Sequence, residues 1–517
     1  MGVGFRDEGE GCVGESGVGE GCAVFERAVA AYGCGGGGED EAGAAGGGGG
    51  SRVPGAGAAG QGWGDARFSR GEARTYAAQY ANVYMVRLAT MRPWLVERVR
   101  SECPGVPVRD LNSVGDAGAD AYGVVGDGSG DCVVVGTVYK EMKLRFTILD
   151  EYSKERGGKS TRSLGDAHLA RYTSDDDACV VEDMTGRTAV VNGPGGQGLD
   201  VAALATGCVV AVRGRVNKAG EFEVARCWLP GLAPLPRPLG TRKTGKLVCF
   251  VSGLGLGGVE GGTPEAALRR SLLVDWLTGH LGGGHEVERA AQVVRLVVAG
   301  NSVDAEEAAS GDKENEGRGG GDKVGGPARE LDMLLTQLCA SLPVDLMPGA
   351  TDPASLALPQ EPLHPCLFPS TARCTYNDAP ALHLCPNPHE FEVDGVRFLG
   401  TGGQNVDDLY KYVSHTEDRV ELMEATMRAR HLCPTAPDTL ACYPFTRIDP
   451  FVVRESPHVY FVGSQPSFGH KVLTHDDGKG QTRLVAVPRF DTTGEAVLLD
   501  LDTLDVRTIS FDIKGAS

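Results

Sequence analysis

The sequence predicts a multidomain α+β protein in which a small closed β-barrel precedes a larger α/β domain. Two observations predict this order. Short β-branched segments separated by turn signals crowd into residues 131–232, whereas buried strands alternate with amphipathic helices from residue 246 onward. The 517 residues are enough for both domains, at about 150 residues per domain, and hydrophobic residues make up 41% of them.

Residues 131–232 have the pattern of an OB-fold barrel. They contain about five short strand-like runs, among them DCVVVGTVYK and EFEVARCWL, separated by turn residues. Barrels that bind single-stranded nucleic acid stack the bases on aromatic side chains. The strands here carry few aromatics beyond Tyr139, Phe222 and Trp228. We therefore expect a structural or protein-binding barrel rather than one that grips a single strand.

The segments around the barrel differ in composition. Residues 1–65 contain runs of four and five glycines and can bury little, which predicts a disordered tail. The Pro-rich residues 233–245 predict a linker, and residues 246–517 form the predicted α/β domain. Within that domain the polar, Gly-rich residues 302–328 predict a disordered insertion.

Residues 66–130 predict a helical N-terminal segment. Apolar and aromatic side chains from Tyr76 to Leu95 recur at spacings of three and four, which places them on one helix face. Pro93 has no N–H to donate, so we expect it to end or kink this helix. A second short helix would then begin near Pro93, with Thr90 as its cap.

Charge and cysteine usage exclude several classes of protein. A net charge of −19 argues against general coating of nucleic acid, because phosphate binders usually present a basic face. The 15 cysteines include no C-x-x-C pair, so neither a zinc ribbon nor a zinc finger is expected. No Walker-type phosphate loop is present either, and no cofactor is expected. No apolar run approaches the roughly 18 residues of a membrane span, and no signal peptide is seen. We expect a soluble intracellular protein with free thiols.

Few local motifs carry chemistry. The run Gly253–Gly258 satisfies G-x-G-x-x-G after a strand, which would suit an oxidoreductase, but Asp275 lies in a helical pattern and not at the end of a second strand. A tight turn is therefore the better interpretation. A loop-rich region also gathers histidines and cysteines that could ligate zinc, although their irregular spacing favours a structural role. These residues are His364, His383, His389, Cys366, Cys374 and Cys385.

Longer strings in the chain resemble the B-subunits of the replicative DNA polymerases. They include LVCFVSGLGLGG, LPVDLMPGATDP, LPQEPLHPCLFP and DPFVVRESPHVYFVGSQPSFG, and the similarity runs from about Phe68 to Phe511. The strings GVRFLGTGGQNVDDLYKY and PTAPDTLACYPF favour the delta type over the epsilon and alpha types, which share the architecture. The resemblance implies an OB-fold joined to a calcineurin-like phosphoesterase domain, a β-sandwich flanked by helices.

Active relatives, including the small subunits of archaeal D-family polymerases, hold two metal ions that clamp a phosphodiester. Their D-x-H motif is matched here by Gly253 and Gly255, which have no side chain to ligate a metal. Their G-D-x-x-D motif is matched by residues 300–304, where Asn301 replaces the bridging aspartate and Asp304 keeps its acid.

The remaining two motifs are also altered. G-N-H-[DE] is matched by residues 349–352, of which only Asp352 survives, and G-H-x-H is matched with Ser464 and Pro466 in place of both histidines. His431 is a further candidate for a histidine ligand. The resemblance therefore implies that the metal ligands are lost and that neither a catalytic residue nor a bound metal is to be expected.

By this resemblance the chain is a non-catalytic scaffold of the nuclear polymerase delta complex in DNA replication and repair. It would bridge the cysteine-rich C-terminal module of the catalytic subunit and an elongated third subunit, and would meet the sliding clamp and DNA only indirectly. No membrane or small-molecule substrate is implied. The alternative is an active metallophosphoesterase or 3′→5′ exonuclease.

Two Pro-rich loops, residues 362–369 and 434–444, are candidates for the partner interface. With the adjoining Phe445, their candidate contacts are His364, Phe368, Tyr443 and Phe445. The same loops are equally candidates for packing between domains, and both alternatives are open at this point.

Overall fold

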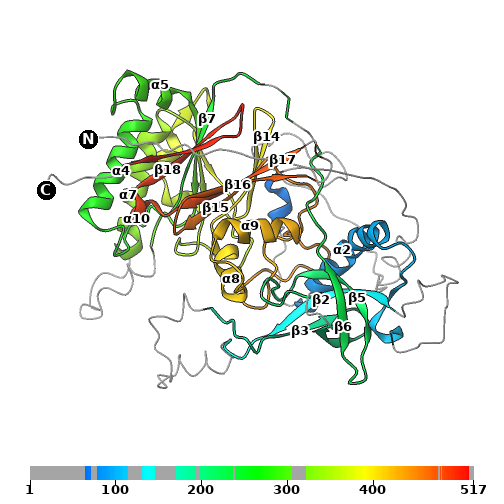
Figure 1. Cartoon of the computed structure of the whole chain (residues 1–517). Helices are drawn as coiled ribbons and strands as arrows, with labels where there is room; N and C mark the ends of the chain where they lie inside the picture. The colour runs from blue at the N-terminus through cyan, green and yellow to red at the C-terminus, as the bar shows by residue number, and fades with distance from the viewer. Residues whose placement is uncertain are drawn as a thin grey trace, which may run out of the picture.

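The computed structural model describes residues 64–70, 78–114, 131–145, 171–193, 198–236, 239–240, 242–304, 322–475, 478 and 480–511. Most of the residues for which the sequence predicts disorder lie outside the described residues. These are residues 1–63 of the predicted tail and residues 305–321 of the predicted insertion. The described residues form a barrel and a layered α/β domain (Figure 1).

The barrel confirms the small closed sheet predicted for this part of the chain. Strand β2 pairs antiparallel with β5 through its first half and with β3 through its second half, so the run β2-β3-β4-β6-β5 closes on itself. Buried side chains such as Val134, Val181 and Phe222 fill the interior. The strands are β1 (Val108–Arg109), β2 (Cys132–Glu141), β3 (Ala178–Glu182), β4 (Arg187–Asn192), β5 (Val209–Val216) and β6 (Phe222–Trp228).

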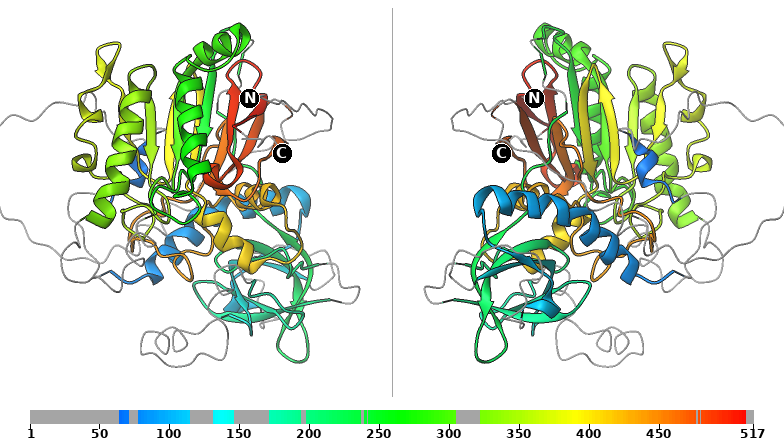
Figure 2. Two further views of the ribbon diagram at one scale, coloured as in Figure 1. Left: turned by 90° about the vertical axis from the view of Figure 1, so that its left-hand side faces the viewer. Right: turned by 90° about the vertical axis from the view of Figure 1, so that its right-hand side faces the viewer.

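Helix α2 (Ala81–Glu102) lies between the barrel and the layered domain (Figure 2). Its buried face, with Leu88, Leu95 and Val99, packs on β2 and β5 of the barrel. The prediction that the helix ends at Pro93 was wrong, because α2 continues through Pro93. The Thr90 hydroxyl does not cap a second helix but donates to the Val86 carbonyl at 2.7 Å. Packing of the apolar face outweighs the one backbone bond that proline removes.

The layered domain contains two sheets packed face to face. The first has the order β12-β9-β8-β7-β18-β19, and its four strands from β12 to β7 are parallel. The second has the order β13-β14-β15-β17-β16, with β14, β15 and β17 parallel. Phe250, Phe398 and Phe461 pack between the sheets.

The strand bounds follow the sequence pattern of short apolar runs. The first sheet contains β7 (Leu247–Val251), β8 (Val293–Ala299), β9 (Val344–Met347), β12 (Leu382–Leu384), β18 (Glu495–Asp500) and β19 (Val506–Ser510). The second contains β13 (His389–Val393), β14 (Val396–Thr401), β15 (Val459–Gln465), β16 (Gly469–Thr474) and β17 (Gln481–Pro488). A small hairpin pairs β10 (Thr375–Tyr376) with β11 (Ala379–Pro380).

Helices cover the outer faces of both sheets, which gives the order helix, sheet, sheet, helix (Figure 1). The first sheet is covered by α4 (Pro264–Leu277), α5 (Gly284–Gln292) and α7 (Asp322–Cys339), and the second by α8 (Gln404–Tyr412) and α9 (Arg419–Arg428). Short helical turns are η1 (Asp65–Phe68), η2 (Leu111–Ser113), η4 (Pro365–Leu367), η5 (Thr371–Arg373) and α10 (Phe490–Thr493). None of the described helices has both the length and the apolar character needed to cross a bilayer.

Three predicted boundaries need correction. Ser302 and Val303 are buried and α7 begins at Asp322, so the ends of the predicted insertion are ordered by packing. The predicted linker begins as part of the core, because Ala233 is fully buried and the Pro234 carbonyl accepts from the Ser456 amide at 2.9 Å. The predicted tail ends before Asp65, which belongs to η1.

A buried ion pair joins α2 to both domains. The Arg87 guanidinium is fully buried, and its Nε donates to Asp449 Oδ2 at 2.8 Å. Its remaining nitrogens donate to the carbonyls of Gly207, Pro434 and Ala436 at 2.7–3.1 Å. A Cβ at position 207 would lie 1.9 Å from the Pro434 carbonyl oxygen, so only glycine permits this approach.

His431 completes this network in its neutral form. Its Nε2 donates to Asp449 Oδ2 at 2.8 Å, while its Nδ1 accepts from the Cys433 amide at 3.2 Å. Burial, reinforced by the nearby Arg87 charge, lowers the pKa of His431 to about 4. The pKa of Asp449 is also lowered, because the Arg87 and His431 contacts outweigh the cost of burying its charge. His431 is therefore committed to this network.

We expect Arg87→Ala to lower the free energy of unfolding by about 3–5 kcal/mol, because it leaves Asp449 charged, buried and short of a partner. Arg92→Ala is the matched control on the same helix. Its partner Asp110 is half exposed, and an exposed pair is worth less than about 1 kcal/mol. Urea unfolding of the full chain measures both. Equal losses would show that the buried pair does not anchor α2.

Acid should destabilise the protein through His431. The folded-state pKa lies below the ordinary value of about 6.5, so the unfolded chain takes up a proton first as the pH falls. The stability that the folded state gains by keeping His431 neutral is complete well above about pH 6.5. About 2 kcal/mol of the free energy of unfolding is lost as the pH falls from 8 to 5. Unfolding of His431→Gln across the same range should lack that loss. Parallel pH profiles for the two proteins would refute this assignment.

Candidate functional site

The candidate site lies where parallel strands of the two sheets end together. Ser252 and Gly253 follow β7, Asn301 follows β8, and an isolated parallel bridge joins Ser252 to Arg489 after β17. Carboxyl ends of parallel strands meet at one edge, which is where α/β domains place their ligands. Asn301 and Ser464 both hold a φ of 56°, a left-handed conformation that side chains rarely adopt. Such conformations gather at functional sites.

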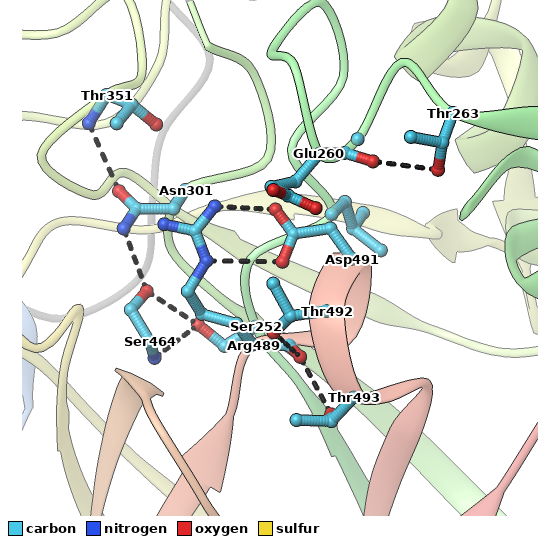
Figure 3. Close-up of polar contacts among 12 residues, drawn as sticks. Ser252, Glu260, Thr263, Asn301, Thr351, Ser464, Arg489, Asp491, Thr492 and Thr493 are labelled. Atoms are coloured by element: carbon cyan, nitrogen blue, oxygen red, sulfur yellow. Dashed lines mark hydrogen bonds and ion pairs between the residues drawn. The ribbon is translucent and has the colours of Figure 1, made fainter. Parts of the chain in front are cut away.

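A chain of neutral hydrogen bonds crosses this edge (Figure 3). The Thr351 amide donates to Asn301 Oδ1 at 3.1 Å, and Asn301 Nδ2 donates to Ser464 Oγ at 2.9 Å. Ser464 Oγ lies 3.0 Å from Ser252 Oγ, which in turn donates to the Ala299 carbonyl at 2.7 Å. Asn301 therefore bonds to Ser464 and to the Thr351 amide, and Ser464 bonds to the Ser252 hydroxyl, so both side chains have neutral partners.

Asp352 is committed to the backbone. One of its carboxylate oxygens accepts from the Val303 amide and the other from the Gly349 amide, each at 2.8 Å. Burial raises the pKa of Asp352 to about 6, and the backbone hydrogen bonds oppose that rise. The carboxylate holds together the turns after β8 and β9, so its structural role is clear from its contacts.

An ion pair between Arg489 and Asp491 lies beside this chain of hydrogen bonds (Figure 3), and it fills the space next to Gly253 and Gly255. Arg489 donates to both oxygens of Asp491, through Nε at 3.1 Å and Nη2 at 2.5 Å. A Cβ at Gly255 would lie 2.4 Å from Asp491 Oδ2, and a Cβ at Gly253 would lie 3.0 Å from Arg489 Cγ. The bond to Asp491, together with the charges of Asp304 and Glu260, raises the pKa of Arg489.

The glycine loop does not offer its amides to a nucleotide. The amides of Gly253, Gly255 and Leu256 donate to backbone carbonyls of residues 300–302 at 2.9–3.1 Å. The N-terminus of α4 is capped by Thr263, whose hydroxyl accepts from the Ala266 amide. A dinucleotide site needs such amides free, so the geometry argues against the oxidoreductase alternative.

The structure brings together most of the residues singled out from the sequence. Gly253, Gly255, Asn301, Asp352 and Ser464 line this edge, with Asp304 beside Arg489. Pro466 is exposed beyond the end of β15.

Sequence reasoning missed Arg489 and Asp491. The signal was present, because both charges directly follow the apolar run of β17 at the carboxyl end of a parallel strand. Nothing local to residues 489–491 links them to a glycine loop more than 200 positions earlier.

The candidate interface residues separate into two groups. Phe368 is buried against the core beneath α7, and Tyr443 and Phe445 are buried in a cluster with Val83 of α2. For these three the structure supports the alternative of packing within the chain. His364 alone of the four is exposed, where its Nδ1 accepts from the Cys366 amide.

Part of the histidine and cysteine group also converges. His389 and Cys385 lie together with Asp65 of η1, and one ligand atom of each lies within 4.8 Å of the others. His383 is nearby, bonded to Asp345 at 2.8 Å. Cys366 and Cys374, by contrast, sit on the loop around η4 and η5 and are not members of this group.

Two family models match the chain, and both describe components of DNA polymerases. Residues 79–227 match the DNA polymerase delta subunit OB-fold domain, and residues 248–470 match the DNA polymerase alpha/epsilon B-subunit. The first range covers α2 and the barrel, and the second covers most of the layered domain. These matches define the class as the B-type accessory chains of DNA polymerases.

Whole-chain relatives narrow the class. The chain is 42% identical to the DNA polymerase delta small subunit of Oryza sativa subsp. japonica, over 86% of this chain and 96% of the relative. It is 40% identical to that of Arabidopsis thaliana over 87% and 95%, and 33% identical to that of Saccharomyces cerevisiae over 85% and 91%. The chain therefore belongs to the DNA polymerase delta small subunit family.

We expect Gly255→Ala to destabilise the protein by about 3 kcal/mol, since the new Cβ collides with Asp491 and the φ of +62° is strained for alanine. Gly245→Ala is the matched control. Its φ of +63° is almost the same, but nothing lies within 4 Å of the new Cβ, so strain alone costs about 1 kcal/mol. Urea unfolding compares the two. Equal costs would show that Asp491 moves aside freely.

Proposed function

We propose that this chain is a non-catalytic accessory subunit of the DNA polymerase delta complex. The family supports the assignment to polymerase delta, because relatives aligned over nearly their whole length carry the name of its small subunit. The contacts at the candidate site support the absence of catalytic activity. The observation that carries the proposal is the Arg489–Asp491 pair packed against Gly253 and Gly255.

The residues at this edge do not fit a two-metal centre. Such a centre needs several carboxylates and histidines that are free to reach the ions. Here two positions are glycines, Asn301 and Ser464 are engaged with neutral partners, and Asp352 accepts two backbone amides. The Arg489 cation also sits among the acids that remain and would repel a metal ion. We infer that the phosphoesterase ligands have been lost.

The fold is consistent with a phosphoesterase origin. Two face-to-face sheets with helices on both outer faces are the arrangement that we expect of a calcineurin-like domain. We assign residues 246–517 to this inactive domain and residues 131–232 to the OB-fold. Because fold alone does not determine function, the proposal depends on the site contacts.

A scaffold role follows from these two inferences. We propose that the chain bridges the cysteine-rich C-terminal module of the catalytic subunit and a third elongated subunit, in the nucleus, during replication and repair synthesis. The sliding clamp and DNA would be reached through those partners. His364 remains a candidate contact because it is exposed. An active metallophosphoesterase or 3′→5′ exonuclease is the alternative, and the site contacts count against it.

Isolation of the tagged chain from its native cells tests the scaffold role. We expect the catalytic chain of polymerase delta and a third, elongated subunit to copurify in stoichiometric amounts, identified by mass spectrometry. Recovery of the chain alone, or with the partners of another polymerase, would overturn the proposal.

Phosphodiester hydrolysis by the purified chain distinguishes the alternative. With Mn²⁺ or Mg²⁺ present, we expect no hydrolysis of single-stranded DNA above the level of a buffer blank, in an assay checked with a known two-metal phosphodiesterase. Metal-dependent hydrolysis abolished by Asp352→Asn would establish the alternative.

A further inference from the structure

The group of Asp65, Cys385 and His389 shares no residue with the candidate site and lies at the edge where the two sheets meet. Cys385 follows the edge strand β12 of the first sheet, and His389 begins the edge strand β13 of the second. Turn η1 lies against β13, where Asp65 Oδ1 accepts from the Glu390 amide at 2.7 Å. Three segments that are distant in the sequence therefore supply one side chain each.

The ring of His389 is held between two carboxylates. Its Nδ1 lies 2.9 Å from both oxygens of Asp65, and its Nε2 lies 3.6 Å from Asp345 Oδ2. Nε2 is buried, because only 5% of the side chain is exposed, and its contact with Asp345 is too long for a hydrogen bond. Phe391 stacks on the ring at 4.8 Å and excludes water from one face. The ring therefore presents Nδ1 to Asp65 and keeps Nε2 toward Asp345.

We propose that Asp65, Cys385 and His389 bind a zinc ion, with Nδ1 of His389 as its nitrogen ligand. One thiolate, one imidazole and one carboxylate form a ligand set that zinc accepts, and hard ions such as Mg²⁺ avoid thiolates. The three ligand atoms lie within 4.8 Å of one another, so small side-chain movements bring them to zinc bond lengths of about 2.0–2.3 Å. A water molecule would take the fourth position.

The surroundings suit such an ion. Asp345 already binds Arg295 at 2.8 Å and His383 at 2.8 Å, so it is not free to be a direct ligand. It faces Nε2, however, and a carboxylate on the second nitrogen is the usual support for a zinc-bound histidine. Binding converts the Cys385 thiol to a thiolate and requires Nδ1 of His389 to give up the proton that it donates to Asp65, so that the ring proton stays on Nε2, toward Asp345; the thiol proton and any second ring proton are released to solvent. The thiolate and Asp65 then balance the two charges of the ion.

The ion would fasten η1 across the open edge between the sheets. This segment is also held by Phe68, which is buried in the core beneath α8 and α9, and by the Arg67–Glu390 ion pair at 2.6 Å. Loss of the Asp65 carboxylate therefore removes the ion without unfolding the domain. Asp65→Asn is therefore the variant that separates loss of zinc binding from loss of folding.

Metal analysis of the full chain tests the site. Cys12, Cys22 and Cys34 lie outside the described residues, so all three are first replaced by serine to remove other thiols. After chelator dialysis and addition of Zn²⁺, we expect about one bound zinc ion per chain. Cys385→Ser and Asp65→Asn should each lower the affinity for zinc by more than about 100-fold. Cys366→Ser and His364→Asn, on the neighbouring exposed loop, are the controls and should bind as the parent does.

Two further measurements identify the ligands and the consequence. Co²⁺ in place of zinc should give a thiolate-to-cobalt absorption band that disappears in Cys385→Ser. Zinc should slow tryptic cleavage after Arg67 in the parent protein but not in Asp65→Asn, with circular dichroism confirming that both are folded. Absence of bound zinc, or binding that survives both Cys385→Ser and Asp65→Asn, would overturn the proposal and leave a hydrogen-bonded His389.

Discussion

The arrangement of the domains depends on one buried cation. Arg87 brings a positive charge from α2 into a site with no exposure to water, where Asp449 neutralises it and three carbonyls take its remaining donors. A buried guanidinium is tolerated only if all of these partners are present together. Because Gly207 belongs to the barrel segment and Pro434, Ala436 and Asp449 to the layered domain, the requirement fixes where the barrel sits.

The same principle explains the contacts at the candidate site. Carboxylates left near one another without a cation repel each other and lose their hydration. Here Arg489 supplies the cation, and Asp491 accepts two hydrogen bonds from it. Asn301 and Ser464 are neutral and bond to each other. The strand ends hold left-handed turns at Asn301 and Ser464, and the charges beside them are satisfied within the chain.

Local sequence patterns determined the order of the elements. Alternating apolar residues and turn signals predicted the closed barrel, and buried runs between amphipathic helices predicted the α/β domain. The residues that the resemblance matched to metal-binding motifs, from Gly253 to Ser464, mostly meet at one edge. That agreement arises because each lies at or just after the carboxyl end of a parallel strand, and parallel strands end together.

Tertiary structure decided the rest, because the deciding contacts join residues that are distant in the chain. Arg87 and Asp449 are 362 positions apart, and no periodicity within a helix reveals that such a side chain is buried. Pro93 breaks isolated helices, yet α2 continues through it because the barrel buries its apolar face. Phe368, Tyr443 and Phe445 looked equally suited to a partner or to the interior, and only packing showed that the interior takes them. Local propensity acts over a few residues, whereas burial and charge pairing are properties of the whole fold.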